Sequence, residues 1–236
     1  MTQCNQKAFP FEAHFSRQVV AGFDGQPMTT DGGGLLLREA DRRIGLLRGV
    51  VRCFTDARRP ERVTHELGVL LAQRIYALAL GYEDLNDHEE LRRDPLLAVL
   101  AGRREIEEPL TGKSTLNRLE RTPAADPLTQ RYHKITYSAE ALDALLVDIF
   151  LEAHRRPPRQ IVLDLDATDT PLHGQQEGRF FHGYYNHYCY LPLYLFAGDH
   201  LLCARLRPSH QDASAGSVPE VERIVGQIRR RCGVPE

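Results

Sequence analysis

The sequence lacks several features that define special classes of protein. No stretch approaches eighteen consecutive apolar residues, so we expect no transmembrane helix and no membrane partner. The N-terminal segment has no basic region followed by an apolar one, so we expect no secretory signal. The five cysteines are scattered without a C-x-x-C pair. This pattern favours reduced thiols in the cytoplasm over a disulfide framework or a zinc ribbon.

Lysine is scarce, although basic residues are not. Of 30 basic residues, 27 are Arg and three are Lys. The planar guanidinium of Arg presents paired donors that suit phosphate groups. The net charge of −2 also conceals segregation: residues 38–62 hold eight Arg against four acidic residues, a local +4, whereas residues 82–109 hold nine acidic residues against four Arg, a local −5. The nearly neutral whole chain therefore does not exclude nucleic acid as a partner.

The first two thirds of the chain are predicted to be mainly helical. The composition, 42% apolar and 26% charged over 236 residues, is typical of one or two globular domains. Residues 1–30 are expected to form an N-terminal arm or an irregular lead-in. Residues 31–157 are expected to form a helical domain that, with its basic segment at 38–62, is a candidate DNA-binding domain. Helices are predicted after the glycines 32–34 with an apolar stripe of Leu36, Ala40, Ile44 and Leu47, over residues 63–80, after an N-cap at Ser114, and over residues 138–153.

The pattern changes to strands after residue 158. Residues 160–166 (QIVLDLD) alternate in the manner of a strand, and residues 188–197 are rich in β-formers, with an irregularity at Pro192. Gly198 and Asp199 predict a tight hairpin into a third strand at 200–207, and a helix is expected near Pro219. The fold class is therefore α+β, a helical domain followed by strand, strand, strand and helix.

Three carboxylates lie within the short segment DLDATDT, residues 164–170. Asp164 and Asp166 fall on one face of the predicted strand, and we expect Asp166 near the C-terminal end of a central strand. Paired acids at a strand end are typical of a divalent cation site, because carboxylate oxygens are the ligands that Mg²⁺ prefers. The alternative is a solvated strand end whose aspartates accept hydrogen bonds from turn amides.

Two other motifs have less support. His182, His187 and Cys189 offer zinc ligands, but the aromatic residues around them fit a strand and hairpin equally well. The segment GKST, residues 112–115, resembles the end of a phosphate-binding P-loop. That motif needs a glycine five residues before Gly112, where this sequence has Glu107, so a P-loop is excluded.

Several blocks of the sequence, in order, resemble bacterial insertion-sequence transposases of the DDE type, the branch called transposase DDE domain group 1. The blocks are TTDGGGLLLREADRRIGLL, RVTHELGVLLAQRIYALALGYEDLNDHEELRRDPLL, STLNRLE, DLDATDTPLHGQQEG and YLPLYLF. The resemblance implies that residues 158–236 form the N-terminal part of an RNase-H-like catalytic domain. It also implies DNA strand cleavage and transfer, with element ends and target DNA as partners, self-association on DNA and a location in the cytoplasm at the nucleoid.

The same resemblance assigns Asp166 as the first acid of the catalytic triad and as a metal ligand, with Asp164 as the runner-up. The cofactor it implies is Mg²⁺ or Mn²⁺ in a two-ion site of the complete protein. The family's second Asp and its Glu follow the helix near Pro219, so we expect this chain to be truncated before them and inactive alone. The alternative function is a non-catalytic DNA-binding or assembly fragment that competes with intact transposase.

The basic segment at 38–62 is the candidate for DNA contacts. Arg52, Arg58 and Arg59 are predicted to contact phosphate groups, because they lie in the most basic stretch of the chain. The alternative is that these arginines solvate the outer face of a helix.

Overall fold

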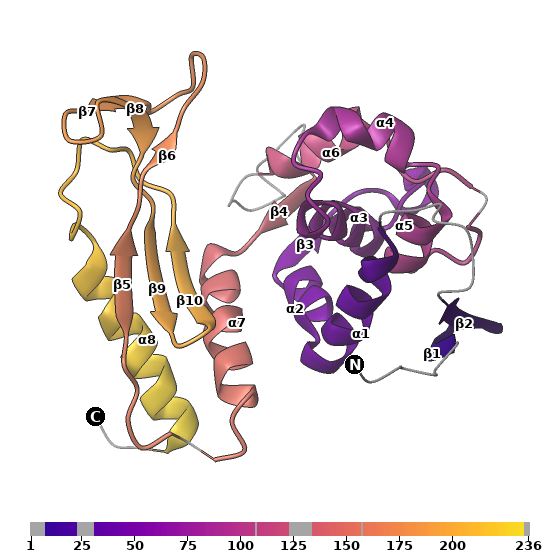
Figure 1. Ribbon diagram of the computed structural model, residues 1–236, viewed down its shortest axis with the longest axis horizontal. Coiled ribbons are helices and arrows are strands. Elements are labelled where there is room, and N and C mark those ends of the chain that lie inside the picture. The colour runs from indigo at the N-terminus through magenta and orange to yellow at the C-terminus, as the bar shows by residue number, and fades with distance from the viewer. Residues whose placement is uncertain (1–7, 23–30, 107, 123–133, 157, 234–236) are drawn as a thin grey trace, which may run out of the picture. The chain divides into compact units, whose positions relative to one another are not determined.

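The computed structural model describes residues 8–22, 31–106, 108–122, 134–156 and 158–233 as a mixed α+β protein with small antiparallel sheets (Figure 1). The chain divides into two compact units, residues 1–139 and 140–236, and each is described by itself. The sequence analysis placed this boundary at residues 157 and 158. In the structure α7 (Ala139–Glu152) groups with the second unit, because Val147 and Phe150 pack into that unit's core.

The described part of the N-terminal segment is a β-hairpin. Strand β1 (Ala8–His14) pairs antiparallel with β2 (Arg17–Gly22), so the expectation of an irregular lead-in was wrong for residues 8–22. Phe11 and Val19 are register partners and pack against the first core cluster of the unit. Burial of these apolar side chains is what a short two-stranded hairpin needs for stability.

The first helical segment is two helices, α1 (Gly34–Ile44) and α2 (Leu46–Arg52), preceded by the short helix η1 (Asp31–Gly33). Gly45 separates them in the left-handed conformation, with φ of 74°, which glycine adopts at little cost. The prediction that Leu36, Ala40, Ile44 and Leu47 form one buried apolar stripe was wrong, because Leu36 is 66% exposed and Ile44 is 51% exposed.

The buried face of α1 instead carries Leu35 and Arg38. The Arg38 guanidinium donates toward the carbonyl oxygen of Glu12 at 3.5 Å and lies 3.4 Å from Nδ1 of His14. Because the β-hairpin supplies these partners, Arg38 is buried, although the sequence pattern had placed the arginines on the exposed face of the helix.

The rest of the first unit packs around α3 (Leu67–Ala79), which confirms the predicted second helix, and Gly81 follows it with positive φ. The remaining elements are β3 (Phe54–Asp56), η2 (Pro60–Arg62), η3 (Leu85–Asp87), α4 (His88–Leu91), α5 (Pro95–Leu100), α6 (Lys113–Glu120) and β4 (Ile135–Tyr137). The antiparallel pair of β3 and β4 was not predicted within a helical domain. The N-cap of α6 is Gly112 and not Ser114, which lies inside the helix.

The second unit places α7 and α8 (Ser217–Cys232) against a three-stranded antiparallel sheet of order β10-β9-β5 (Figure 1). The strands are β5 (Asp164–Ala167), β9 (Leu193–Ala197) and β10 (His200–Arg205), and Gly198 and Asp199 form the predicted turn. A second small sheet of order β6-β8-β7 comprises β6 (Thr170–Pro171), β7 (Phe180–His182) and β8 (His187–Tyr190). Pro192 lies between β8 and β9 and ends the predicted long strand, since it has no amide proton to donate.

The core of the second unit is fixed by the sheet register. Leu193, Leu195 and Ala197 alternate on the buried face of β9 and pack with Val147 of α7 and Ile224 of α8. Helix α8 confirms the helix predicted near Pro219, and its residues Val221, Ile224 and Ile228 pack against this core. Within the described part of the chain, none of the helices combines the length and apolarity needed to cross a bilayer.

Candidate functional site

The two predicted acids lie on one face of β5. Asp164 and Asp166 are both exposed, and alternation along the strand places them on the same side of the sheet. Asp164 is directly opposite Phe196, and Asp166 is opposite Tyr194. Since the buried residues of β9 point the other way, the two carboxylates lie on the face that α7 and α8 do not cover. The structure thus brings together the two acids that the sequence indicated.

The position of β5 differs from the expectation in two respects. The strand begins at Asp164 rather than at residue 160, because Ile161 and Leu163 pack against the core cluster outside the ladder. Among the described residues β5 is also an edge strand, and β9 is the central one. Asp166 is still the penultimate residue of β5, so its carboxylate lies near the C-terminal end of the strand.

The third carboxylate of the segment has a partner. Asp169 Oδ2 is 2.7 Å from Nε2 of His187, which follows on β8. Desolvation raises the pKa of the nearby Tyr185, and the charges of Asp169 and Asp166 raise it further. Because it joins the segment after β5 to β8, the Asp169–His187 pair anchors the loop after β5. The carboxylates of Asp164 and Asp166, in contrast, form no hydrogen bond with a described residue.

The chemistry of these donors fits a divalent cation in part. Two exposed carboxylates on one strand face supply the hard oxygen ligands of Mg²⁺, which commonly binds through one or two carboxylates and several waters. Among the residues that the structure describes, no group of three or more His, Cys, Asp or Glu is arranged to hold a metal. Asp166 and Asp164 would therefore hold one ion together with water.

The zinc alternative rested on His182, His187 and Cys189. His182 and His187 are opposite each other in the β7–β8 ladder, and Cys189 is buried opposite Phe180. His187 is engaged by Asp169, and all four cysteines in the described ranges are free thiols. The aromatic residues of this segment form the predicted strand and hairpin.

The three predicted DNA-binding arginines lie in different surroundings. Arg52 and Arg59 are exposed, at the end of α2 and just before η2. Arg58 instead donates to both carboxylate oxygens of Asp56, with Nη2 at 2.7 Å from Oδ2, and to the carbonyl oxygen of His65. Burial opposes ionisation of Asp56, but the hydrogen bonds and charge of Arg58 outweigh it and lower the pKa of that carboxyl.

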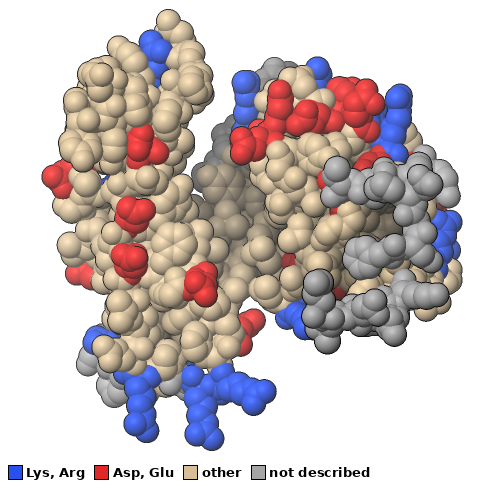
Figure 2. Space-filling view, in the orientation of Figure 1, with Lys and Arg blue, Asp and Glu red and all other residues tan. Residues whose placement is uncertain are grey.

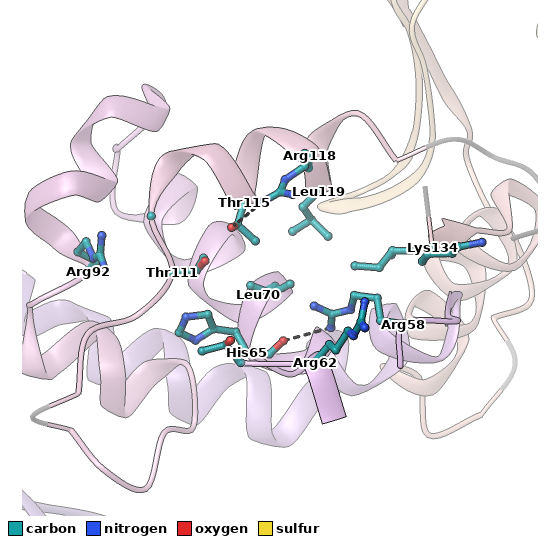
Figure 3. A pocket seen from close by; sticks show the side chains of 13 residues that line it. Arg58, Arg62, His65, Leu70, Arg92, Thr111, Thr115, Arg118, Leu119 and Lys134 are labelled. Atoms are coloured by element: carbon teal, nitrogen blue, oxygen red, sulfur yellow. Dashed lines mark hydrogen bonds between the residues drawn. The ribbon is translucent and has the colours of Figure 1, made fainter. Parts of the chain in front are cut away.

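Arg58 lies at the edge of a cleft of about 520 Å³ within the first unit, here called the basic cleft (Figure 3). Its walls are α6 on one side and the segment around η2 on the other, with Leu70 of α3 between them. The residues that line it are Arg58, Arg62, Thr64, His65, Leu70, Arg92, Thr111, Gly112, Thr115, Arg118, Leu119, Lys134 and Ile135. The described lining therefore contains four arginines and one lysine and no carboxylate.

Sequence reasoning missed this cleft. Arg62 belongs to the basic stretch, but Arg92 lies in the segment that was identified as acidic, and Arg118 and Lys134 are distant in sequence. A charge count along the chain could not detect the cleft, because tertiary packing brings its cations together from four separate segments.

A second basic surface lies at the end of α8. The last turn of this helix carries Arg229, Arg230 and Arg231, and Arg231 Nε is 3.1 Å from Asp148 Oδ1. Figure 2 shows blue side chains at the lower end of this unit and separate red carboxylates over its sheet. Cations at a helix C-terminus are stabilised by the helix dipole, so these residues have a structural explanation.

Comparison with known families identifies the chain. The sequence profile of the family described as Transposase DDE domain group 1 matches residues 11–233. The chain therefore belongs to the transposase DDE domain group 1 family. Transposases of the DDE type act on DNA and generally use divalent metal ions. A search of curated proteins and a search of solved structures each gave no match.

Proposed function

We propose that this protein acts in DNA transposition through metal-dependent cleavage and joining of DNA strands, and that Asp166 is its first catalytic carboxylate. The observation that carries the proposal is the pair of exposed carboxylates on the open face of β5, within a chain that the family profile matches over residues 11–233. Asp166 takes precedence over Asp164 because it is closer to the loop that Asp169 and His187 anchor.

Divalent ions in such sites activate the attacking oxygen and stabilise the leaving oxygen of the phosphodiester. The role of Asp166 is to hold an ion at the uncovered face of the sheet, and Asp164 supplies a further oxygen two residues earlier. Tyr194, opposite Asp166, borders the position where a DNA strand would approach.

We also propose that β5, β9, β10 and α8 begin an RNase-H-like core. The antiparallel sheet of order β10-β9-β5, with α8 after β10 in the chain, supports this. The edge of β5 away from β9 pairs with no strand among the described residues, so its backbone groups can accept a further strand. Self-association on DNA and a cytoplasmic, nucleoid-associated location belong to the same proposal.

The test is Mn²⁺ binding to the 236-residue chain, measured by electron paramagnetic resonance, with DNA affinity measured in parallel. Asp166→Asn should weaken Mn²⁺ binding by roughly tenfold, a loss of about 1.4 kcal/mol, and leave DNA affinity almost unchanged. Asp199→Asn, in the exposed β9–β10 turn, is the matched control and should change neither quantity. Equal Mn²⁺ affinity in the wild type and Asp166→Asn would refute the assignment.

A second function, DNA binding without strand cleavage, is favoured by the basic cleft, because its lining residues all lie within the first unit. Two carboxylates on β5 supply ligands for one ion, so we expect the 236 residues alone not to nick pre-cleaved end DNA in Mn²⁺. Metal-dependent nicking that disappears in Asp166→Ala would instead show that these residues suffice for cleavage.

A further inference from the structure

We propose that the basic cleft binds an unpaired, phosphate-bearing nucleotide of a DNA strand, and not the duplex itself. The inference rests on the proposed function, because it specifies which part of the DNA this unit recognises. It is carried by the charge of the cleft, by its size and by its apolar floor, and two buried nitrogens without partners belong to residues of its wall.

Two of the arginines that line the cleft are available for a phosphate group. Arg62 is exposed and, among the described residues, has no ion pair. Arg118 donates to the carbonyl oxygen of Ser114 and to Oγ1 of Thr115, both neutral oxygens, at 3.3 Å. Arg58 is neutralised by Asp56 and contributes less. Two guanidinium groups thus face the cleft without a carboxylate, and Arg is the side chain best suited to bidentate phosphate contacts.

Two nitrogen atoms of residues in the wall lack a hydrogen-bond partner among the described residues. Nδ1 of His65 and Nε of Arg92 are buried, and neither forms a hydrogen bond with a described residue. A buried polar group without a partner costs on the order of 1–3 kcal/mol, which a ligand that reached these nitrogens would recover. Burial lowers the pKa of His65, and the charges of Arg103, Arg92 and Arg58 lower it further, against an opposing contribution from Glu108.

The size of the cleft selects a small unit of nucleic acid. Its volume of about 520 Å³ lies within the range of small-molecule sites, about 300–1,000 Å³. Interfaces with duplex DNA bury on the order of 1,000 Å² of protein surface or more, which a bounded cleft does not offer. One nucleotide fits this space, whereas a double helix does not.

The floor of the cleft is apolar, as a base requires. Leu70, Leu119 and Ile135 line it beside the cationic rim, and Leu70 is almost fully buried. Unpaired bases bind proteins by placing their faces on apolar or aromatic side chains while basic groups follow the backbone. In Figure 3 the cations lie around the periphery of the view and Leu70 at its centre. This arrangement places the base inward and the phosphate outward.

One wall is held rigidly before any ligand arrives. The side-chain amide of Gln73 accepts from the backbone N–H of Thr111 at 3.2 Å and donates to its carbonyl oxygen at 2.9 Å. Glu89 accepts from the backbone N–H of Lys113, which follows the lining residue Gly112, and this contact fixes the start of α6. A preformed wall reduces the entropy lost on binding.

The experiment compares the affinity of the full chain for three probes by fluorescence anisotropy: a blunt duplex, the same duplex with a 5′-phosphorylated unpaired extension, and the extension alone as a single strand. The wild type should prefer the extended duplex over the blunt one by roughly tenfold, as one well-bound nucleotide contributes at least 1–3 kcal/mol. The double variant Arg62→Gln/Arg118→Gln should lose this preference and bind both duplexes alike.

The matched control is Arg43→Gln/Arg93→Gln, which removes the same charge from exposed positions outside the cleft and should keep the preference. The single variant Arg62→Gln, at an exposed position, serves if the double variant does not fold. A wild type that binds both duplexes equally, or cleft and control variants that lose the preference equally, would overturn the cleft assignment alone. A wild type that binds none of the probes would overturn the proposed function as well.

Discussion

The two units present opposite chemistry to a nucleic acid. The first unit concentrates cations in the basic cleft, where Arg58, Arg62 and Arg118 surround an apolar floor. The second unit presents carboxylates, Asp164 and Asp166, on an open sheet face. Cations attract the DNA backbone, whereas carboxylates repel it unless a divalent ion lies between them. Under the proposed function, this difference assigns DNA affinity to the first unit and metal-dependent chemistry to the second.

Each unit is also held by its own buried polar network. In the first unit Gln73 links α3 to Thr111 and lies 3.1 Å from Nδ1 of the buried His88. In the second unit Arg205 of β10 joins Asp143 of α7 to Glu220 of α8. Burial opposes ionisation of Glu220, but hydrogen bonds from Arg205 and Arg223 outweigh it and lower its pKa. These separate networks allow the division of function to be tested one unit at a time.

The largest expected effect is on the stability of the second unit. Arg205→Met should destabilise it by roughly 2–4 kcal/mol, because Asp143 would be left buried without its cation and Glu220 would keep only Arg223. The partial exposure of Arg205 reduces this cost. Urea unfolding followed by circular dichroism measures the loss. Arg229→Met, on the exposed end of α8, is the control. A shift as small as that of the control would show that the network contributes little.

A smaller loss of stability is expected in the first unit. Gln73→Met keeps the volume of the side chain but leaves the N–H and carbonyl groups of Thr111 unpaired, at a cost of about 1–3 kcal/mol. The same variant should weaken binding of the extended duplex, since Thr111 lines the basic cleft. Unfolding and anisotropy measurements on one preparation test both effects. Full stability with weakened binding would contradict the link between the wall and the fold.

Acid should destabilise the first unit before the second. Burial lowers the pKa of His88, and the charge of Arg74 lowers it further, against opposing contributions from Asp87 and Glu120. The unfolded state, with a histidine pKa of about 6.5, takes up the proton first, so stability is retained above that pH and falls as the pH decreases below it.

The free energy of unfolding should change with pH by no more than about 1.4 kcal/mol per pH unit for one histidine. Urea unfolding at pH values on both sides of 6.5 measures it, with His88→Gln as the comparison. The variant should be less stable than the wild type near neutral pH, but its stability should depend less on pH. Identical pH dependence in both proteins would mean that another group causes the acid sensitivity.

The smallest expected effect concerns individual phosphate contacts. Each arginine that contacts duplex DNA should contribute about 0.9 to the slope of log affinity against log salt. Arg52→Ala and Arg59→Ala should each lower the slope by about that amount, whereas Arg58→Ala should lower it less, because Asp56 already neutralises Arg58. Unchanged slopes for Arg52 and Arg59 would show that these residues only solvate the surface.

Local patterns in the sequence predicted much of the second unit. Alternation placed Asp164 and Asp166 on one strand face, Gly198 and Asp199 formed the predicted turn, and Pro192 interrupted the strand where an amide donor was lacking. Each of these features depends on neighbouring residues, so each is visible in a short window of sequence.

Features that depend on distant partners were not predictable. Arg38 is buried because the β-hairpin supplies acceptors, which no helical pattern reveals. Strands β3 and β4 pair although helices α3, α4, α5 and α6 lie between them in the sequence. The basic cleft draws Arg92 from a segment with an acidic local charge. In all three cases the deciding contact joins residues that are far apart in the chain.

The most direct test of the division between the two units measures Mn²⁺ affinity and DNA affinity in reciprocal variants of the full chain. Asp166→Asn should weaken Mn²⁺ binding and leave binding of the extended duplex unchanged. Arg62→Gln/Arg118→Gln should weaken binding of the extended duplex and leave Mn²⁺ affinity unchanged. If either variant reduced both affinities to the same extent, metal binding and DNA binding would not be separate properties of the two units.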